Sequence, residues 1–338
     1  MKPTLIIAEI GVNHNADWDL AVAMIQTAAK SGADVIKFQT AIPELVQTTQ
    51  APMAEYQVTN TGKEESQLEM SREFHFAHEA FPRLKAEVEK RGKVFMSTAF
   101  DLKSLDLLTA MGETTYKIPS GEITNLPYLR AIGFRAQKVL LSTGMATWQE
   151  VQDAVQSLLA CGMNKSQITV LQCNTEYPTP FEDVNLRAMV SMGESLGLEY
   201  GYSDHTLGIE AAIAAVALGA TVIEKHFTTD CTLPGPDQKA SLEPTDFAEM
   251  VRCIRNIEIA LGDGIKRPTA SEAKNKFIAR RGVFTAAAVA GGEIFTLSNL
   301  IALRPEMGLS PMHIDQVLGK KAARNLPAQH PLSLDDVE

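Results

Sequence analysis

A repeated alternation of short β-branched runs with longer amphipathic segments dominates the first 228 residues of the chain. In the first amphipathic segment, Leu20, Met24 and Ala28 recur at helical spacing, and Gly32 follows as a stop signal. This alternation is typical of parallel strands joined by helices. The predicted strands are residues 5–10, 34–40, 93–98, 115–119, 139–143, 168–173, 199–203 and 221–227. Eight such units favour a closed (β/α)8 barrel, with an open doubly wound sheet as the alternative.

The pattern changes after residue 262. Residues 244–262 predict a last long helix, with Pro244 near its start and Gly262 at its end. Residues 263–280 are polar and basic and predict a linker. Residues 281–338 contain short apolar pieces and glycine turns, which indicate a small, mostly β module. We therefore expect a barrel domain over 1–262, a linker over 263–280 and a second domain over 281–338.

Composition excludes several classes of function. The net charge is −10 and the basic residues are scattered, which argues against a nucleic-acid partner. The longest apolar stretch is too short to cross a bilayer, so no membrane role is expected. The four cysteines form no zinc-binding or CxxC spacing, and the N-terminus lacks the features of an export signal, so we expect a cytoplasmic protein. A small anionic substrate would require local cations.

Polar residues end all eight predicted strands. In a parallel barrel these ends meet at one face, where active sites form. The residues concerned are Glu9, Asn13 and His14; Lys37 and Gln39; Ser97 and Thr98; Lys117, Ser120 and Glu122; Ser142 and Thr143; Asn174, Thr175 and Tyr177; Ser203, Asp204 and His205; and Glu224, Lys225 and His226.

Two of these strand ends carry a lysine. Strand alternation places Lys37 on the same face as Val35 and Gln39. A lysine that points into a barrel requires a compensating anion, so Lys37 and Lys117, together with nearby serine hydroxyls, predict a cradle for a phosphate or carboxylate. The alternative is that each lysine reaches water or pairs with Glu9 or Glu122.

Two histidines end neighbouring strands. His205 and His226 could both reach one metal ion, and a site with two protein ligands keeps positions open for water and substrate, as Lewis-acid catalysis requires. Glu224 lies on the same strand face as His226 and could orient it. The alternative is that each imidazole only satisfies hydrogen bonds.

Seven segments contain most of these residues: AEIGVNHN at 8–15, IKFQT at 36–40, YKIPSGEITNLPYL at 116–129, LSTGM at 141–145, YPTPFEDVNL at 177–186, GYSDHTLG at 201–208 and EKHFT at 224–228. Their types and order resemble the sialic acid synthase family. The segment GVFTAAAVAGGEIFTLSNLIALRP resembles that family's antifreeze-like (SAF) domain. The resemblance covers essentially the whole chain.

This resemblance implies a synthase that condenses phosphoenolpyruvate with an N-acylated mannosamine-type sugar. It implies a divalent cofactor, typically Mn²⁺ with Mg²⁺ or Co²⁺ possible, bound by His205 and His226. It further implies catalytic roles for Glu9, Glu122 and Lys117. The implied phosphoenolpyruvate ligands are Lys37, Thr98, Lys117, Ser120, Ser142 and Ser203, and the implied sugar ligands are Glu9, Gln39, Tyr177, Asp237 and Arg304. Arg304 would enter the barrel of a second subunit, which implies a domain-swapped homodimer.

The sequence also bears on the identity of the acceptor sugar. The stretches PSGEITNLPYL, CNTEYP and KASLEP look closest to bacterial legionaminic acid synthases, which favours 2,4-diacetamido-2,4,6-trideoxymannose over N-acetylmannosamine. Thr175 and Ile278 depart from the pattern of many sialic acid synthases. Two other classes stay open: a Schiff-base aldolase with Lys117 as nucleophile, and a non-enzymatic ice- or glycan-binding module on an inert barrel.

Overall fold

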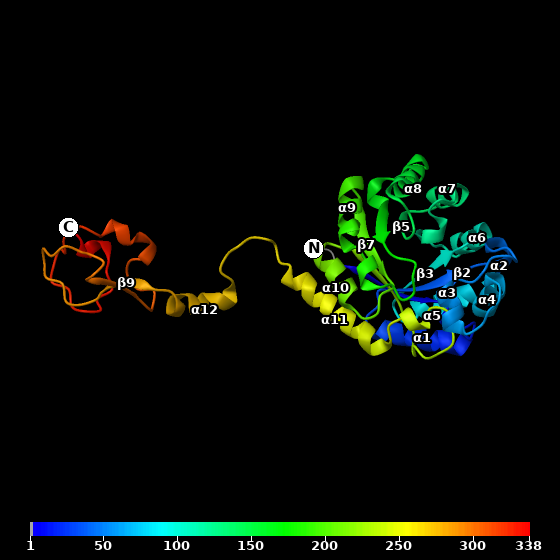
Figure 1. Ribbon diagram of the computed structural model, residues 1–338, viewed down its shortest axis with the longest axis horizontal. Helices are drawn as coiled ribbons and strands as arrows, with labels where there is room; N and C mark the ends of the chain where they lie inside the picture. The colour runs from blue at the N-terminus through cyan, green and yellow to red at the C-terminus, as the bar shows by residue number, and fades with distance from the viewer. Residues whose placement is uncertain (1–2) are drawn as a thin grey trace. The chain divides into compact units, whose positions relative to one another are not determined.

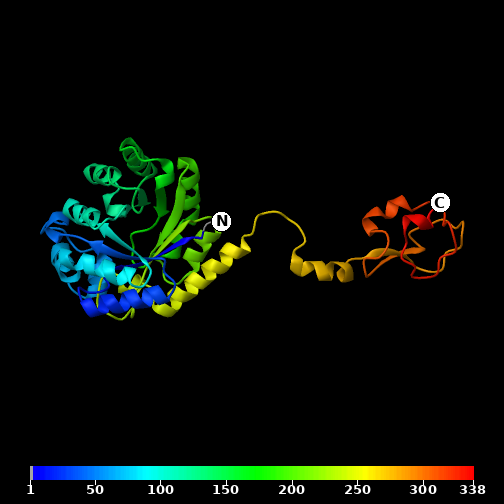
Figure 2. The same ribbon diagram turned by 180° about the vertical axis from the view of Figure 1, so that it is seen from behind.

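The computed structural model describes residues 3–338 and divides the chain into two compact units, one that extends to Gly262 and one from Asp263 to Glu338. In the first unit, helices surround a ring of strands, which is visible from both sides in Figures 1 and 2. The second unit is much smaller and contains its own apolar core.

All eight predicted strands are present and parallel. They are β1 (Leu5–Gly11), β2 (Val35–Thr40), β3 (Val94–Ala99), β4 (Thr115–Ile118), β5 (Lys138–Ser142), β6 (Ile168–Gln172), β7 (Glu199–Asp204) and β8 (Val222–His226). Their order in the sheet is β3-β2-β1-β8-β7-β6-β5-β4. The end strands β3 and β4 touch, but among the described residues no ladder of hydrogen bonds joins them. The sheet is therefore a near-barrel of eight parallel strands, which confirms the predicted (β/α)8 barrel fold.

Helices surround the strands. They are α1 (Trp18–Lys30), α2 (Pro43–Val46), α3 (Glu55–Thr61), α4 (Gln67–Phe74), α5 (Phe81–Glu89), α6 (Leu102–Ala110), α7 (Leu126–Gly133), α8 (Trp148–Ala160), α9 (Leu186–Leu196), α10 (Glu210–Ala217) and α11 (Pro244–Ala260). Most of them lie on the outside of the barrel, and α3 and α4 lie at its mouth. The Asp17 carboxylate caps α1 by accepting a hydrogen bond from the Leu20 amide. Met24 and Ala28 are buried, as the helical spacing predicts.

The interior of the barrel changes from apolar to polar along the strands. A lower layer of buried side chains consists of Ile7, Val35, Met96, Leu140, Leu171 and Val222. Gly201 makes room for this layer, because a Cβ atom there would lie 2.4 Å from the Val222 carbonyl oxygen. Each buried aliphatic side chain contributes about 1.5–3 kcal/mol to folding. This layer closes the barrel below the polar residues, which stand two positions further along each strand.

The C-terminal unit is built from short β pieces. It contains β9 (Gly282–Thr285) and β10 (Leu300–Leu303), paired antiparallel, together with several isolated β-bridges. The segment that we predicted as a linker contains a helix, α12 (Ala270–Ala279), which Thr269 and Glu272 cap reciprocally. The sequence did not predict this helix because it has no stripe of large apolar residues at helical spacing, and none of its residues is buried. Among residues 3–338, no helix is both long and apolar enough to cross a membrane.

Candidate active site

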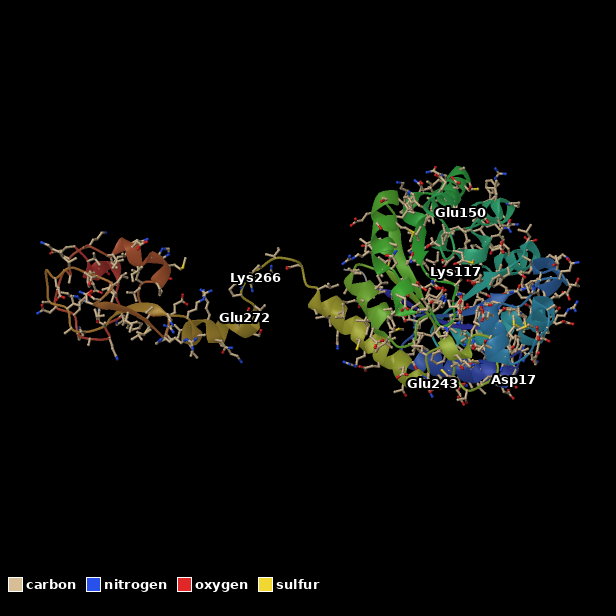
Figure 3. The ribbon with its side chains drawn as sticks, in the orientation of Figure 1. Asp17, Lys117, Glu150, Glu243, Lys266 and Glu272 are labelled. Carbon is tan, nitrogen blue, oxygen red and sulfur yellow. The ribbon has the colours of Figure 1, made fainter. Side chains whose placement is uncertain are left out.

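The polar layer lines a cavity of about 390 Å³ at the carboxyl ends of the strands, which we call the main cavity. Figure 3 shows Lys117 inside the ring of strands. The main cavity brings together eleven of the residues predicted for the site: Glu9, Lys37, Gln39, Thr98, Lys117, Ser120, Ser142, Tyr177, Ser203, His205 and His226. The strands β1 to β8 all contribute, either from within the strand or from the loop that follows it.

Two buried lysines and two buried glutamates form one charged network in the main cavity. Lys37 Nζ lies 2.6 Å from Glu9 Oε2 and 3.6 Å from Glu224 Oε2, and Lys117 Nζ lies 3.0 Å from Glu224 Oε1. Lys37 therefore pairs with Glu9, as one sequence alternative proposed. Lys117 pairs with Glu224 rather than with Glu122. The network holds both ammonium groups at the bottom of the cavity, where an anionic ligand would meet them.

The electrostatics of the two glutamates differ. Burial raises the pKa of Glu9 above its ordinary value, against the attraction of Lys37. Burial also acts to raise the pKa of Glu224, but the ammonium groups of Lys117 and Lys37 outweigh it and lower this pKa to about 2. Glu224 is thus a fixed negative charge, whereas Glu9 retains a proton more readily than an ordinary carboxyl group.

Hydroxyl groups surround this network. Thr98 Oγ1 accepts a hydrogen bond from Lys37 Nζ at 3.1 Å, and Ser203 Oγ donates to Glu224 Oε1 at 3.0 Å. Ser120 Oγ accepts from the Gly144 amide at 3.0 Å. Ser142 Oγ is buried and has no hydrogen-bond partner among the described residues. Together with the lysines, these groups provide the donors that a phosphate or carboxylate requires.

The two predicted metal ligands lie side by side above the network. The ring centroids of His205 and His226 are 5.3 Å apart. His205 Nδ1 donates to the Asn174 carbonyl at 2.5 Å, which leaves Nε2 as the free ligand atom. Glu224 does not orient either imidazole, contrary to our expectation, because its hydrogen bonds go to Lys117 and Ser203. Burial lowers the pKa of His205 to about 4 and that of His226 well below its ordinary value, so both rings are neutral at pH 7.

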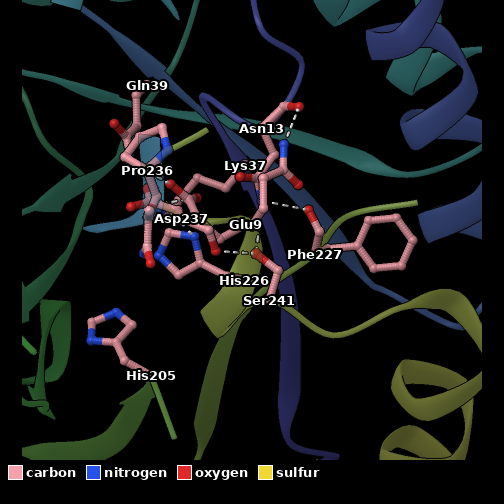
Figure 4. Close-up of polar contacts among 12 residues, drawn as sticks. Glu9, Asn13, Lys37, Gln39, His205, His226, Phe227, Pro236, Asp237 and Ser241 are labelled. Carbon is pink, nitrogen blue, oxygen red and sulfur yellow. Dashed lines mark hydrogen bonds and ion pairs between the residues drawn. The ribbon is translucent and has the colours of Figure 1, made fainter. Parts of the chain in front are cut away.

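Tyr177 and Asp237 stand beside the histidines. The Tyr177 ring stacks on His205 with centroids 4.1 Å apart, and Asp237 Oδ2 lies 3.9 Å from His226 Nδ1. Figure 4 shows Asp237 gathered with Glu9, Lys37, Gln39 and His226. Burial, and then the charge of Glu9, raises the pKa of Asp237 to about 7.

Asn13 holds the loop that carries Asp237. Its Nδ2 atom donates to the Phe227 carbonyl at 3.0 Å and to Ser241 Oγ at 2.8 Å, and Ser241 Oγ donates to the Asp237 carbonyl at 2.8 Å. Figure 4 shows this chain of contacts. Asn13 is thus a positioning residue and not part of the cavity wall, although the sequence grouped it with the converging strand ends.

Asp204 and Lys225 also face away from the main cavity. Strand alternation turns both toward the surrounding helices, where they form an ion pair of 2.8 Å with both side chains fully buried. Lys225 Nζ also donates to the Thr206 carbonyl at 2.6 Å. Since Asp204 precedes His205 and Lys225 precedes His226, this pair fixes the backbone on which both imidazoles stand.

We predict that Lys225→Met destabilises the protein by about 3–5 kcal/mol, because it leaves the Asp204 carboxylate buried without its cation. The measurement is the unfolding free energy from chemical denaturation. Lys225→Met combined with Asp204→Asn should recover part of the loss, because the second change removes the unpaired charge. An unfolding free energy unchanged by Lys225→Met would contradict a structural role for the pair.

Three predicted site residues are not among those that line the main cavity, and one of them is Asp237, which lies beside it. Glu122 lies in a short 3-10 turn after β4, and its Oε2 accepts a hydrogen bond from Asn125 Nδ2 at 2.6 Å. Arg304 is an exposed residue of the C-terminal unit, directly after β10. The catalytic role of Glu122 and the role of Arg304 stay predictions.

Part of the cavity wall was not predicted from the sequence. Tyr56 and Gln57 of α3 and Gln67 of α4 line the main cavity, as do Met145 and Cys173. The first three belong to the long segment between β2 and β3, which folds over the mouth of the barrel. Only the unusual length of that segment could have indicated a contribution to the site.

The geometry defines a barrel whose main cavity holds two buried ammonium groups beside two histidines, and the comparisons with known proteins give the family of this barrel. Residues 24–266 match the NeuB family and residues 280–338 match the SAF domain. The chain belongs to the NeuB family. The predicted family, fold and enzyme class, a condensing synthase, are confirmed.

The named relatives define the class of synthase more closely. The chain is 48% identical to the N,N'-diacetyllegionaminic acid synthase of Campylobacter jejuni, over 96% of this chain and 97% of that one. It is 34% identical to the pseudaminic acid synthase of Helicobacter pylori, over 100% and 99%. The solved N-acetylneuraminic acid (sialic acid) synthetase of Leptospira borgpetersenii superposes with a TM-score of 0.70 at 34% identity, over 81% of this chain and 90% of that one. These findings support a synthase of the nonulosonic acid class.

Proposed function

We propose that the chain condenses phosphoenolpyruvate with 2,4-diacetamido-2,4,6-trideoxymannose and water to give N,N'-diacetyllegionaminate and phosphate. The 48% identity to the Campylobacter jejuni enzyme supports this acceptor. The observation that carries the proposal is the main cavity, in which two buried ammonium groups lie beside two neutral imidazoles.

The three-carbon donor carries a carboxylate and a phosphate. Lys37 and Lys117 supply the two cations that such a ligand requires, and the hydroxyls of Thr98, Ser120, Ser142 and Ser203 supply neutral donors around them. Lys37, Lys117, Thr98 and Ser203 are buried and already hold ion pairs or hydrogen bonds within the protein, so they are ordered before the donor binds. Binding therefore orients the donor with little further loss of side-chain freedom.

His205 and His226 fit a divalent metal ion. Both rings are neutral, and His226 Nδ1 is buried without a hydrogen-bond partner among the described residues. Within residues 3–338, no group of three or more His, Cys, Asp or Glu side chains is arranged to hold a metal, so the proposed donor set is the two imidazoles. We favour Mn²⁺, with Mg²⁺ and Co²⁺ as alternatives. Such an ion would supply Lewis-acid stabilisation to the acceptor carbonyl.

The bond changes of the condensation require a group that gives up a proton and takes one back. C3 of phosphoenolpyruvate bonds to the aldehyde carbon of the open-chain sugar, and the aldehyde oxygen takes a proton. Water then adds to C2, and the bond from C2 to the phosphate oxygen breaks. One of the two protons of that water returns to the group that protonated the aldehyde oxygen. The other proton leaves with phosphate. Glu9 suits this transfer because burial raises its pKa and Gln39 Nε2 holds its Oε1 at 3.1 Å.

The other candidate functions make different demands. N-acetylneuraminate synthesis from N-acetylmannosamine needs the same donor site and differs only in the acceptor. A Schiff-base aldolase needs a free lysine amine, whereas the ammonium group of Lys117 is bound by Glu224. The homodimer, the insertion of Arg304 and the cytoplasmic location stay predictions.

We predict one main product when the enzyme is given phosphoenolpyruvate, Mn²⁺ and an equimolar mixture of the two sugars. Mass spectrometry should find the acid with two acetamido groups in excess, with one phosphate released per product. A dominant product from N-acetylmannosamine would instead assign N-acetylneuraminate synthesis. Absence of any nine-carbon keto acid would contradict the condensation itself.

A further inference from the structure

A second cavity of about 200 Å³ opens beside the main cavity, and we call it the side chamber. The two cavities share part of their walls, namely Gln39, Tyr56, Gln57, Gln67, Phe100 and Tyr177. The side chamber extends from there under the segment between β2 and β3, to Gln47, Ser71 and His75. The two cavities are therefore adjacent, with these shared side chains between them.

The side chamber lies at the end of the acceptor remote from its aldehyde, if the proposed function holds. The aldehyde carbon must meet the donor, which is bound by Lys37 and Lys117. Gln39 and Tyr177 line both cavities and Asp237 lines the side chamber, so the acceptor crosses the boundary between them. The substituents on its fourth to sixth carbons then point into the side chamber.

The walls of the side chamber are apolar or uncharged apart from Asp237. Val12, Met70 and Phe74 form one buried apolar cluster on its wall. His75 is neutral at pH 7, because burial lowers its pKa. No lysine or arginine is among the described residues that line the chamber. A phosphate group would meet no cation there, whereas a group with a methyl end and a neutral amide would find matching surfaces.

One amide on the wall of the side chamber has an oxygen without a partner. Gln47 Oε1 is buried and has no hydrogen-bond partner among the described residues. Gln57 differs, because its Oε1 already accepts a hydrogen bond from the Ala54 amide at 2.9 Å. An unsatisfied buried carbonyl oxygen is costly, and an N–H donor from a ligand would remove that cost.

We propose that the side chamber recognises a second acylamino substituent of the acceptor, remote from its aldehyde, and that Gln47 accepts a hydrogen bond from the N–H of that substituent. The acyl methyl group packs against Met70 and Phe74. This inference rests on the proposed function and adds the residue that distinguishes a diacetamido sugar from one with a hydroxyl group at the same carbon. A hydroxyl group has no acyl group to fill the chamber and leaves it to water.

The test compares kcat/KM for the diacetamido trideoxy sugar and for N-acetylmannosamine in the full chain with Mn²⁺. Gln47→Met removes the acceptor oxygen at nearly constant volume. It should lower kcat/KM for the diacetamido sugar roughly 10-fold. The value of kcat/KM for N-acetylmannosamine should stay within about 2-fold of that of the unchanged enzyme. Val46→Phe, which fills the side chamber from its wall, should act in the same direction without touching Gln47. The KM for phosphoenolpyruvate should not change in either variant.

Gln149→Met is the matched control, because Gln149 is exposed on the first turn of α8 and lines neither cavity. It should leave kcat/KM for both acceptors unchanged. Equal losses for the two sugars in Gln47→Met, or no loss for either, would overturn the role of the side chamber. Failure of the proposed function looks different: the unchanged enzyme would then form no product from phosphoenolpyruvate with either sugar.

Discussion

Lys117→Met is expected to lower kcat/KM at least about 1000-fold, with the loss present for both acceptor sugars. The substitution leaves one cation, Lys37, facing two carboxylates, Glu9 and Glu224, at the bottom of the main cavity. A doubly anionic donor would then approach a surface of net negative charge in a buried site, where charge interactions are strong. Steady-state kinetics with varied phosphoenolpyruvate measures the effect.

Two variants separate the possible causes of that loss. Lys138→Met removes a lysine at the opposite end of a barrel strand, where it pairs with Glu199 near the surface, and should be nearly silent. Adding Glu224→Gln to Lys117→Met removes the unpaired carboxylate and should restore part of the donor affinity. Donor KM and turnover that survive Lys117→Met would refute the predicted cradle.

Covalent trapping distinguishes the Schiff-base alternative. Borohydride reduction with pyruvate labels a lysine that forms an imine. We expect no labelled lysine, because Glu224 binds the Lys117 ammonium at 3.0 Å. A peptide labelled at Lys117 would instead indicate a Schiff-base aldolase.

The barrel could be predicted because each strand repeats the same local rule. Residues two apart share a face, so an apolar residue such as Val35 below a polar one such as Lys37 already indicates a closed lower layer and a polar mouth. The same rule turns Lys225 away from Glu224 and His226. Applied strictly to every strand, it would have separated the ion pair of Lys225 with Asp204 from the cavity residues in advance.

The cross-barrel contacts could not be predicted. Lys117 on β4 and Glu224 on β8 are 107 residues apart in sequence and meet only because the barrel curves. Alternation within each strand says that both point inward, but it gives no distance between strands that are not neighbours. The sequence alternative therefore named only Glu9 and Glu122 as possible partners of the two lysines, whereas in the structure Lys117 pairs with Glu224 and Glu122 accepts a hydrogen bond from Asn125.

The positions of residues beyond the strand ends could not be predicted from the sequence either. Gly11 has a φ of +55°, so the chain turns after β1 and alternation no longer tells where Asn13 points. The segment that contributes Gln47, Tyr56 and Gln67 has helical pieces but no sequence signal for its path over the barrel mouth. The side chamber depends on that path, which is why it emerged only from the structure.

His226→Ala is expected to abolish turnover with either sugar while leaving the fold intact. The side chain is buried against the ring of Tyr177 but faces the main cavity, so its loss empties space at the site rather than in the core. One imidazole remains, and a single protein ligand binds a divalent ion weakly. Turnover, circular dichroism and Mn²⁺ binding by equilibrium dialysis measure the three consequences.

The exposed His313→Ala serves as the matched control and should retain both Mn²⁺ binding and turnover. Treatment of the unchanged enzyme with a chelator should stop the reaction, and added Mn²⁺ should restore it, because two imidazoles with open positions release metal readily. Unchanged turnover in His226→Ala would remove the metal assignment. Retained Mn²⁺ binding without turnover would instead leave His226 to act on the acceptor directly, next to Tyr177 and Asp237.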